Sequence, residues 1–223
     1  MKVKLVSYSQ PTLEMMQEGL KDVQDMIAFC ARVSNPSNQL NMETTDKLIK
    51  YLIKHKHWSP LEMASACLEI ETTRDIARQM LRHRSFSFQE FSQRYADPTK
   101  DLDFVLREAR LQDVVNRQSS IAVNDKELTA AWAEQQTAVI KAAKAAYTWA
   151  INNGIAKEQA RSVLPEGNTV SRLYMNGTLR SWIHFIEIRS GNGTQQEHAE
   201  VALECARVIS SIFPLATEFV SEK

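Results

Sequence analysis

The spacing of hydrophobic residues divides the chain into a few short strands and several longer helices. Apolar and polar residues alternate, as in a half-buried strand, at 3–9, in the later part of 59–73 and at 167–175. Hydrophobic residues recur with helical spacing at 12–33, 42–55, 127–153, 157–164, 178–189 and 195–213. No repeat or low-complexity linker interrupts this pattern. Residues 1–223 are therefore expected to form a single α+β domain, in which several helices pack on a small mixed or antiparallel sheet.

One more helix is expected directly after the strand in 59–73. Thr72 followed by Asp75 resembles a capping box, and Ile76, Ala77 and Met80 supply an apolar face. Gly154 is expected to end the long helix 127–153, because glycine adopts the left-handed conformation common after helix C-termini. The polar stretch 97–125 shows no period and predicts no element.

The overall composition excludes several classes of protein. Lysine plus arginine and aspartate plus glutamate each number 27, so the basic excess typical of nucleic-acid coats and membrane-surface proteins is absent. No segment approaches the roughly 20 apolar residues of a bilayer span, and the first residues contain too short an apolar run for a secretory signal. Cys30, Cys67 and Cys205 are odd in number and lie among apolar residues, which favours reduced thiols in a cytoplasmic protein.

A cluster of arginines at 74–94 is the strongest sign of function. The segment LRHRSFSFQEFSQRY (81–95) places Arg82, His83 and Arg84 side by side, and seven residues separate them from Ser92. Five arginines in 74–94 stand against two acidic residues, in a chain of no net charge. A solvated helix face is one explanation, but such faces mix in lysine, whereas arginine suits bidentate contacts with phosphate. The cluster therefore favours a site for a small phosphorylated ligand.

Other functions stay open at this point. The aromatic side chains in 86–95 could stack on the bases of a nucleic acid, although the neutral total charge argues against such a partner. His55, His57 and Glu62 could hold a metal ion in a nucleotide hydrolase, but their spacing matches no zinc pattern. The chain holds no glycine-rich phosphate loop or dinucleotide fingerprint.

Arginines recur in the last third of the chain. In RSWIHFIEIR (180–189), Trp182, Ile183 and Ile186 can face a core, while Arg180 and His184 share another face. Ordinary amphipathicity explains this segment by itself. Alternatively, its arginines form the second half of the anion site.

Four blocks of the sequence together resemble one enzyme family. Arg82-His83-Arg84, seven residues and then Ser92 resembles the signature of the flavin-dependent thymidylate synthases, and Arg94-Tyr95 continues it. The upstream block, the downstream block and the last helix block are similar as well, at His55, His57, Ser59, Pro60 and Glu62, at Arg161 with 163–165, and at 180–189. The resemblance extends over most of the chain and is weakest at 97–125.

The resemblance implies a reaction and an assembly. The family converts dUMP to dTMP with methylenetetrahydrofolate as carbon donor, and NADPH supplies the reducing equivalents through bound FAD. Its members are described as homotetramers whose active sites are built from several chains. No cysteine of this chain lies in a polar cluster that would lower its thiol pKa, which agrees with a flavin route that needs no protein cysteine nucleophile.

The resemblance also implies a role for individual residues. Arg189 would hold the pyrimidine as the catalytic residue, and no metal is implied. Contacts with the flavin would come from His57, Ser59, Glu62, Arg82, His83, Arg84, Glu90, Thr178, Arg180 and His184. Contacts with dUMP would come from Gln79, Arg82, Glu90, Phe91, Ser92, Gln93, Arg94, Arg161 and Arg189. The chain departs from the family at Met63, where histidine is common, at His184, where asparagine is common, and in the SGNG loop 190–193, which lacks a histidine of some relatives.

Overall fold

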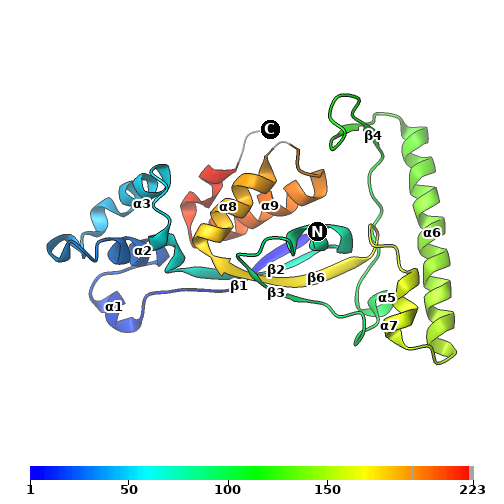
Figure 1. Ribbon diagram of the computed structural model, residues 1–223, viewed down its shortest axis with the longest axis horizontal. Coiled ribbons are helices and arrows are strands. Elements are labelled where there is room, and N and C mark those ends of the chain that lie inside the picture. The colour runs from blue at the N-terminus through cyan, green and yellow to red at the C-terminus, as the bar shows by residue number, and fades with distance from the viewer. Residues whose placement is uncertain (192, 221–223) are drawn as a thin grey trace.

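The computed structural model describes residues 1–191 and 193–220, and a four-stranded sheet lies at its centre. The strands run in the order β1 (Lys2–Tyr8), β2 (Ser65–Thr73), β6 (Val170–Thr178) and β3 (Ser87–Glu90). Each neighbouring pair is antiparallel, so the antiparallel alternative of the sequence prediction is the one found. Figure 1 shows α8 (Leu179–Ser190) and α9 (Gln196–Ile209) covering one face of this sheet.

Two groups of helices extend from opposite ends of the sheet (Figure 1). One group consists of α1 (Leu13–Gln17), α2 (Val23–Ala31) and α3 (Thr45–Lys54). The other holds α5 (Pro98–Asp101), α6 (Lys126–Asn152), α7 (Lys157–Ala160) and a small hairpin of β4 (Arg110–Gln112) and β5 (Ser120–Ala122). The short helix α4 (Arg74–Met80) follows β2 directly, as α8 follows β6. The ends of the two central strands therefore lead straight into helices that carry expected site residues.

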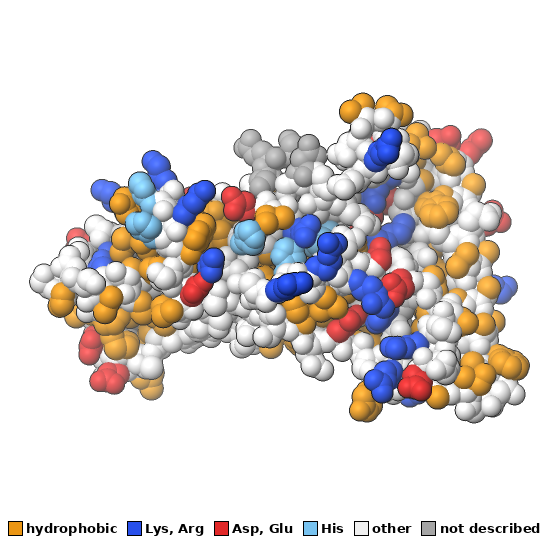
Figure 2. Space-filling model, in the orientation of Figure 1, with side chains coloured by type: hydrophobic (Ala, Val, Ile, Leu, Met, Phe, Trp, Pro, Cys, Tyr) orange, Lys and Arg blue, Asp and Glu red, His pale blue; other side chains and the backbone are white. Residues whose placement is uncertain are grey.

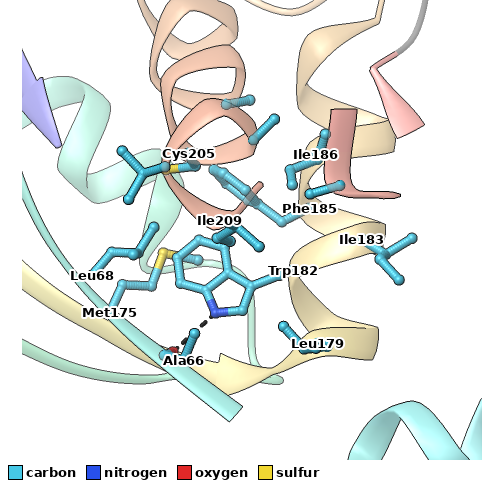
Figure 3. Packing of buried hydrophobic residues seen from close by; sticks show 14 of the residues in the cluster. Ala66, Leu68, Met175, Leu179, Trp182, Ile183, Phe185, Ile186, Cys205 and Ile209 are labelled. Atoms are coloured by element: carbon cyan, nitrogen blue, oxygen red, sulfur yellow. Dashed lines mark hydrogen bonds between the residues drawn. The ribbon is translucent and has the colours of Figure 1, made fainter. Parts of the chain in front are cut away.

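The hydrophobic core lies between the sheet and the helices α8 and α9. Alternate residues of β2 and β6, including Leu68 and Met175, point into it, as the period of two requires. Trp182 of α8 is fully buried at its centre, and its indole Nε1 donates a hydrogen bond to the carbonyl oxygen of Ala66 at 3.0 Å (Figure 3). Because this bond satisfies the one polar atom of the indole, the side chain can be buried completely.

Gly177 permits the closest contact in this core. A Cβ atom at this position would lie 2.4 Å from the ring of Phe86, much closer than carbon atoms can approach. Phe86 in turn packs edge-on against Trp182, with ring centroids 4.8 Å apart. A glycine in β6 therefore lets the turn after α4 lie flat against α8.

Two details of the predicted helices are wrong. Residues 12–33 form two helices, because the chain turns at Gly19 with a φ of +111° and Asp22 caps a second helix by accepting hydrogen bonds from the amides of Gln24 and Asp25. The capping box does not form: β2 extends to Thr73, which precedes α4 and donates its hydroxyl to Asp75 without accepting a hydrogen bond from a helix amide. Gly154 does end α6, with a φ of +77°.

Candidate functional site

The turn after α4 and the end of α8 bring His83 and Arg189 together. Nε of Arg189 donates a hydrogen bond to Nε2 of His83 at 2.9 Å, and the ring of Phe185 lies edge-on to the imidazole at 5.1 Å. Burial, then the positive charge of Arg189, lowers the pKa of His83 to about 4. His83 is therefore neutral at pH 7 and accepts with Nε2. Of the three adjacent residues 82–84, only the two arginines are therefore charged at pH 7.

Gln79 is held by a residue that the sequence did not reveal. Nδ1 of His198, on α9, lies 3.2 Å from Oε1 of Gln79, and Nε2 of Gln79 donates to Gln195 at 2.8 Å. His198 is fully buried, and burial lowers its pKa to about 3. The only sequence feature that could have indicated His198 is its position on the apolar face of α9, three residues before Val201. A histidine on such a face indicates core packing as readily as function.

The arginines of 74–94 divide into paired and unpaired groups. Arg74 is buried and lies 3.3 Å from Glu90, and Arg78 lies 2.6 Å from Glu166. Arg82 and Arg84 are exposed, and no carboxylate of the described ranges lies within ion-pair distance of them. Figure 2 shows basic side chains gathered beside histidine in the middle of one face of the molecule. Within 74–94, the positive charge that the sequence predicted for a ligand therefore comes from the guanidinium groups of Arg82 and Arg84.

The remaining residues expected at the flavin form a second group beside the first turn of α8. Glu62, in the 3-10 helix Ser59–Glu62, forms an ion pair with Arg180. Thr178 caps α8 by accepting a hydrogen bond from the amide of Ser181 at 3.3 Å, and His184 is exposed one turn after Arg180. His57 and Ser59 are exposed on the segment between α3 and β2. One chain therefore brings Glu62 and Arg180 together.

The residues expected at dUMP follow β3 and lie partly apart from this group. Glu90 accepts a hydrogen bond from Ser171 at 2.7 Å, Phe91 is half-buried and Ser92 is exposed. Gln93 is 4% exposed, and its Nε2 has no hydrogen-bond partner in the described ranges. A buried amide donor without a partner suits an oxygen of a ligand.

Arg94 and Arg161 lie at the far end of the molecule from α3. Arg94 is exposed, with Nε 3.9 Å from Glu158 of α7, and Arg161 is half-buried in the 3-10 turn that follows α7. In the part of the chain that the structure describes, no hydrogen bond or ion pair joins either residue to Arg189. Figure 1 shows α7 well apart from α8, so one chain does not bring the turn after α7 to the end of α8.

The stretch 97–125 contributes a half-buried ion network that sequence reasoning missed. Arg107 lies 2.7 Å from Asp75 and 3.1 Å from Glu197, and Arg110 forms an ion pair with Glu197. Gln195 donates to Glu197 at 3.0 Å, so the network continues to the partner of Gln79. The stretch has no hydrophobic period, and nothing in the sequence indicated these pairings.

The structure offers no support for a metal site or a membrane span in its described residues. No group of three or more His, Cys, Asp or Glu side chains there could hold a metal ion. The rings of His55 and His57 lie 6.2 Å apart beside Tyr51. No helix there is long and apolar enough to cross a membrane. Among the departures from the family, Met63 is exposed, and Asn192 of the SGNG loop lies outside the described residues.

Comparisons with known proteins identify the family of this chain. The sequence model of the family described as thymidylate synthase complementing protein matches residues 15–215. A flavin-dependent thymidylate synthase of Synechocystis is 48% identical, and a probable one of Paramecium bursaria Chlorella virus 1 is 45% identical, each over 96% of both chains. The crystal structure of the UMP/dUMP methylase PolB of Streptomyces cacaoi with 5-Br dUMP has a TM-score of 0.78 and 25% identity, over 98% of this chain and 93% of that one. The chain therefore belongs to the flavin-dependent thymidylate synthases, a family of enzymes.

Proposed function

We propose that the chain converts dUMP to dTMP, with methylenetetrahydrofolate as carbon donor and NADPH as reductant, through bound FAD in a cytoplasmic homotetramer. The observation that carries the proposal is the placement of Arg189, which His83 holds by a 2.9 Å hydrogen bond beside two exposed arginines that have no carboxylate partner in the described ranges. The relatives named above support it, because two of them are named for this activity and the third binds a dUMP analogue.

The donor set fits a flavin dinucleotide. Arg82 and Arg84 have no carboxylate partner in the described ranges, so a diphosphate would provide the missing negative charge. Neutral His83 retains its Nδ1–H as a donor, and the ion pair of Glu62 with Arg180 would fix one wall of the site. When bound, FAD would carry the reducing equivalents, and the protein would bind and orient it.

Arg189 would act on the pyrimidine. Burial, then the nearby charge of Arg82, lowers its pKa, but arginine stays protonated and can stabilise negative charge on the ring oxygens. Nε2 of Gln93, which has no partner in the described ranges, would add an uncharged contact, as would Gln79, which His198 holds. Ser92 would donate its hydroxyl to the nucleotide and need not act as a nucleophile.

The cysteines support a route without a protein thiolate. Burial raises the pKa of Cys205 well above the ordinary value, and desolvation raises the pKa of Cys30 and Cys67. A thiol with a raised pKa is a poor nucleophile at pH 7. Carbon 5 of dUMP would instead become nucleophilic because the positive charge of Arg189 lies close to the ring and stabilises negative charge on the ring oxygens.

The proposed homotetramer accounts for the separation of the dUMP contacts. Arg94 and Arg161 lie away from Arg189 within one chain, and a second chain could bring an equivalent pair to each Arg189. Mass measurement in solution tests this part: a purely monomeric, active enzyme would contradict it.

The reaction is tested by release of tritium from dUMP labelled at carbon 5, with FAD, NADPH and methylenetetrahydrofolate present. We expect tritium release and dTMP from a yellow protein whose flavin absorbance changes when dUMP is added. A colourless protein that takes up no FAD would contradict the proposal and favour a non-catalytic nucleotide-binding or nucleic-acid-binding role.

The role of Arg189 has its own test. Arg189→Ala should reduce dTMP formation at least about a thousandfold, because one preorganised donor at a developing charge contributes roughly two to three orders of magnitude and the charge is lost as well. FAD should stay bound. Arg207→Ala, which removes an exposed arginine paired with Glu204 on α9, is the control and should keep full activity. Turnover that survives Arg189→Ala would show that the assigned role is wrong.

A further inference from the structure

A hollow between α2 and α3 has a basic lining without an acidic residue. Its volume is about 540 Å³, and its walls include Arg32, Asn35, Asn38, Lys47 and Tyr51. The net charge of the whole chain is zero, so a wall with two cations and no carboxylate is a local exception. The hollow therefore has the charge expected for an anion site.

Arg32 is a buried cation with an incomplete set of partners. Its side chain belongs to a residue only 7% exposed, and Nη2 donates to Oγ1 of Thr44 at 2.9 Å. Nη1 is buried and has no hydrogen-bond partner in the described part of the chain. No carboxylate there forms an ion pair with Arg32 or with Lys47. A buried charge is stable when an opposite charge and hydrogen bonds compensate it. The described residues supply no such counter-charge to the guanidinium of Arg32.

One wall of the hollow lies next to a residue of the proposed flavin site. Tyr51 lines it, and the ring of Tyr51 lies 4.2 Å from the ring of His55 and 6.2 Å from that of His57. His57 is one of the residues expected to contact the flavin. A molecule that reacts at the flavin could therefore extend past Tyr51 into the hollow.

We propose that this hollow binds the anionic end of a co-substrate, which in the proposed reaction is the 2′-phosphate of NADPH or a glutamyl carboxylate of the folate. The two groups share the chemistry that the site selects: an oxyanion that accepts hydrogen bonds from the guanidinium of Arg32 and attracts Lys47. Asn35 and Asn38 add uncharged amide donors at the rim. The proposal rests on the proposed function.

The test uses Lys47→Glu, because Lys47 is exposed and its substitution leaves the core intact. The control is Lys141→Glu on α6, an equal change of charge at an exposed lysine outside the hollow. KM is measured for NADPH against NADH, and for polyglutamyl against monoglutamyl methylenetetrahydrofolate. We expect Lys47→Glu to raise the KM for either NADPH or polyglutamyl methylenetetrahydrofolate about tenfold, corresponding to one lost charge contact. kcat and the KM of the less charged analogue should stay within about twofold.

Which KM rises identifies the source of the oxyanion. Arg32→Lys, which keeps the charge but loses the planar fork, should raise the same KM by a smaller factor. Two ratios are compared: KM for NADPH over KM for NADH, and KM for polyglutamyl over KM for monoglutamyl methylenetetrahydrofolate. The proposal is overturned if neither ratio in Lys47→Glu differs from that of the wild type and of Lys141→Glu. It is also overturned if Lys47→Glu changes only the mass of the assembly, because a carboxylate of another chain would then be the partner of Arg32.

A second measurement does not depend on turnover. Inorganic pyrophosphate should raise Tm of the wild type and of Lys141→Glu more than that of Lys47→Glu, because a ligand that binds only the folded state stabilises it. A protein that shows this difference but forms no dTMP would contradict the proposed function and keep the anion site. Equal Tm increases in all three proteins would contradict the anion site alone.

Discussion

The centre of the molecule and its long helix α6 bury their hydrophobic residues very differently. Trp182 and Phe185 of α8 are fully buried between the sheet and α9. On α6, a helix of 27 residues, Trp149 is 63% exposed and Val139 is 53% exposed, and the few buried positions include Tyr147. The centre therefore has a complete core within one chain, whereas α6 presents an apolar face that one chain leaves open. An exposed face of this kind is typical of an interface, which agrees with the proposed assembly.

The sharpest test of this difference is a pair of tryptophan substitutions. Trp182→Ala should lower the free energy of unfolding by about 3–5 kcal/mol, because it leaves a large cavity and removes the hydrogen bond to the carbonyl oxygen of Ala66. Trp149→Ala should change the unfolding of a single chain by no more than about 0.5 kcal/mol. Denaturant unfolding at low protein concentration measures both. Equal effects of the two substitutions would remove the distinction between centre and helix.

The same pair separates stability from assembly. If α6 lies in an interface, Trp149→Ala should lower the mass of the assembly in solution at micromolar concentration, while Trp182→Ala should act through unfolding. An unchanged mass for Trp149→Ala would place the interface elsewhere on the chain.

A smaller effect is expected from the close contact in β6. Gly177→Ala should destabilise the protein by about 1–3 kcal/mol, because its Cβ would lie 2.4 Å from the ring of Phe86 and force both apart. Gly167→Ala is the matched control, since the nearest atom to its Cβ is the Asp75 carboxylate at 4.0 Å. Thermal unfolding of the two variants compares them; a Tm for Gly177→Ala equal to that of the control would mean that the ring moves freely.

A gradual pH dependence is also expected at the centre. His83 and His198 have pKa values lowered to about 4 and about 3, so the folded state binds fewer protons than the unfolded chain. Stability should therefore fall as the pH drops below about 6.5, by at most about 1.4 kcal/mol per pH unit for each histidine, and be unaffected above it. Urea midpoints at pH 7.5, 6 and 5 measure this slope.

Two variants isolate the contribution of His83. His83→Gln should make the slope shallower without removing it, because His198 still contributes, whereas His55→Gln, which changes an exposed histidine after α3, should leave it as in the wild type. Identical slopes in all three proteins would mean that other groups cause the loss of stability.

Strong periodicity made most of the fold predictable from the sequence. The strands β2 and β6 and the helices α6, α8 and α9 alternate or repeat clearly, and the structure has each of them close to its expected position. The single helix predicted at 12–33 is wrong, because Gly19 and the cap at Asp22 are local signals that the hydrophobic spacing overrode. The hairpin of β4 and β5 was not predicted, because its residues are mostly exposed and carry no period.

The site was predictable to a lesser degree. The sequence indicated an anion site at 82–84, and the structure leaves Arg82 and Arg84 unpaired in its described ranges. It did not indicate that Arg74 and Arg78 are neutralised by Glu90 and Glu166, since those pairings join residues 16 and 88 positions apart, beyond the reach of helical spacing. Contacts such as that of His198 with Gln79, 119 residues apart, depend on how α9 packs against α4.

The bond between Arg189 and His83 also limits the direction from which a ligand can approach. A guanidinium group offers two edges to a flat partner: a side edge that includes Nε–H, and an end edge formed by the two terminal amino groups. His83 already occupies Nε–H. Only the end edge stays available, so a planar ring that pairs with Arg189 must meet it head-on, along the axis of the side chain. In the proposed reaction, the imidazole would thus set the angle at which the pyrimidine ring meets Arg189.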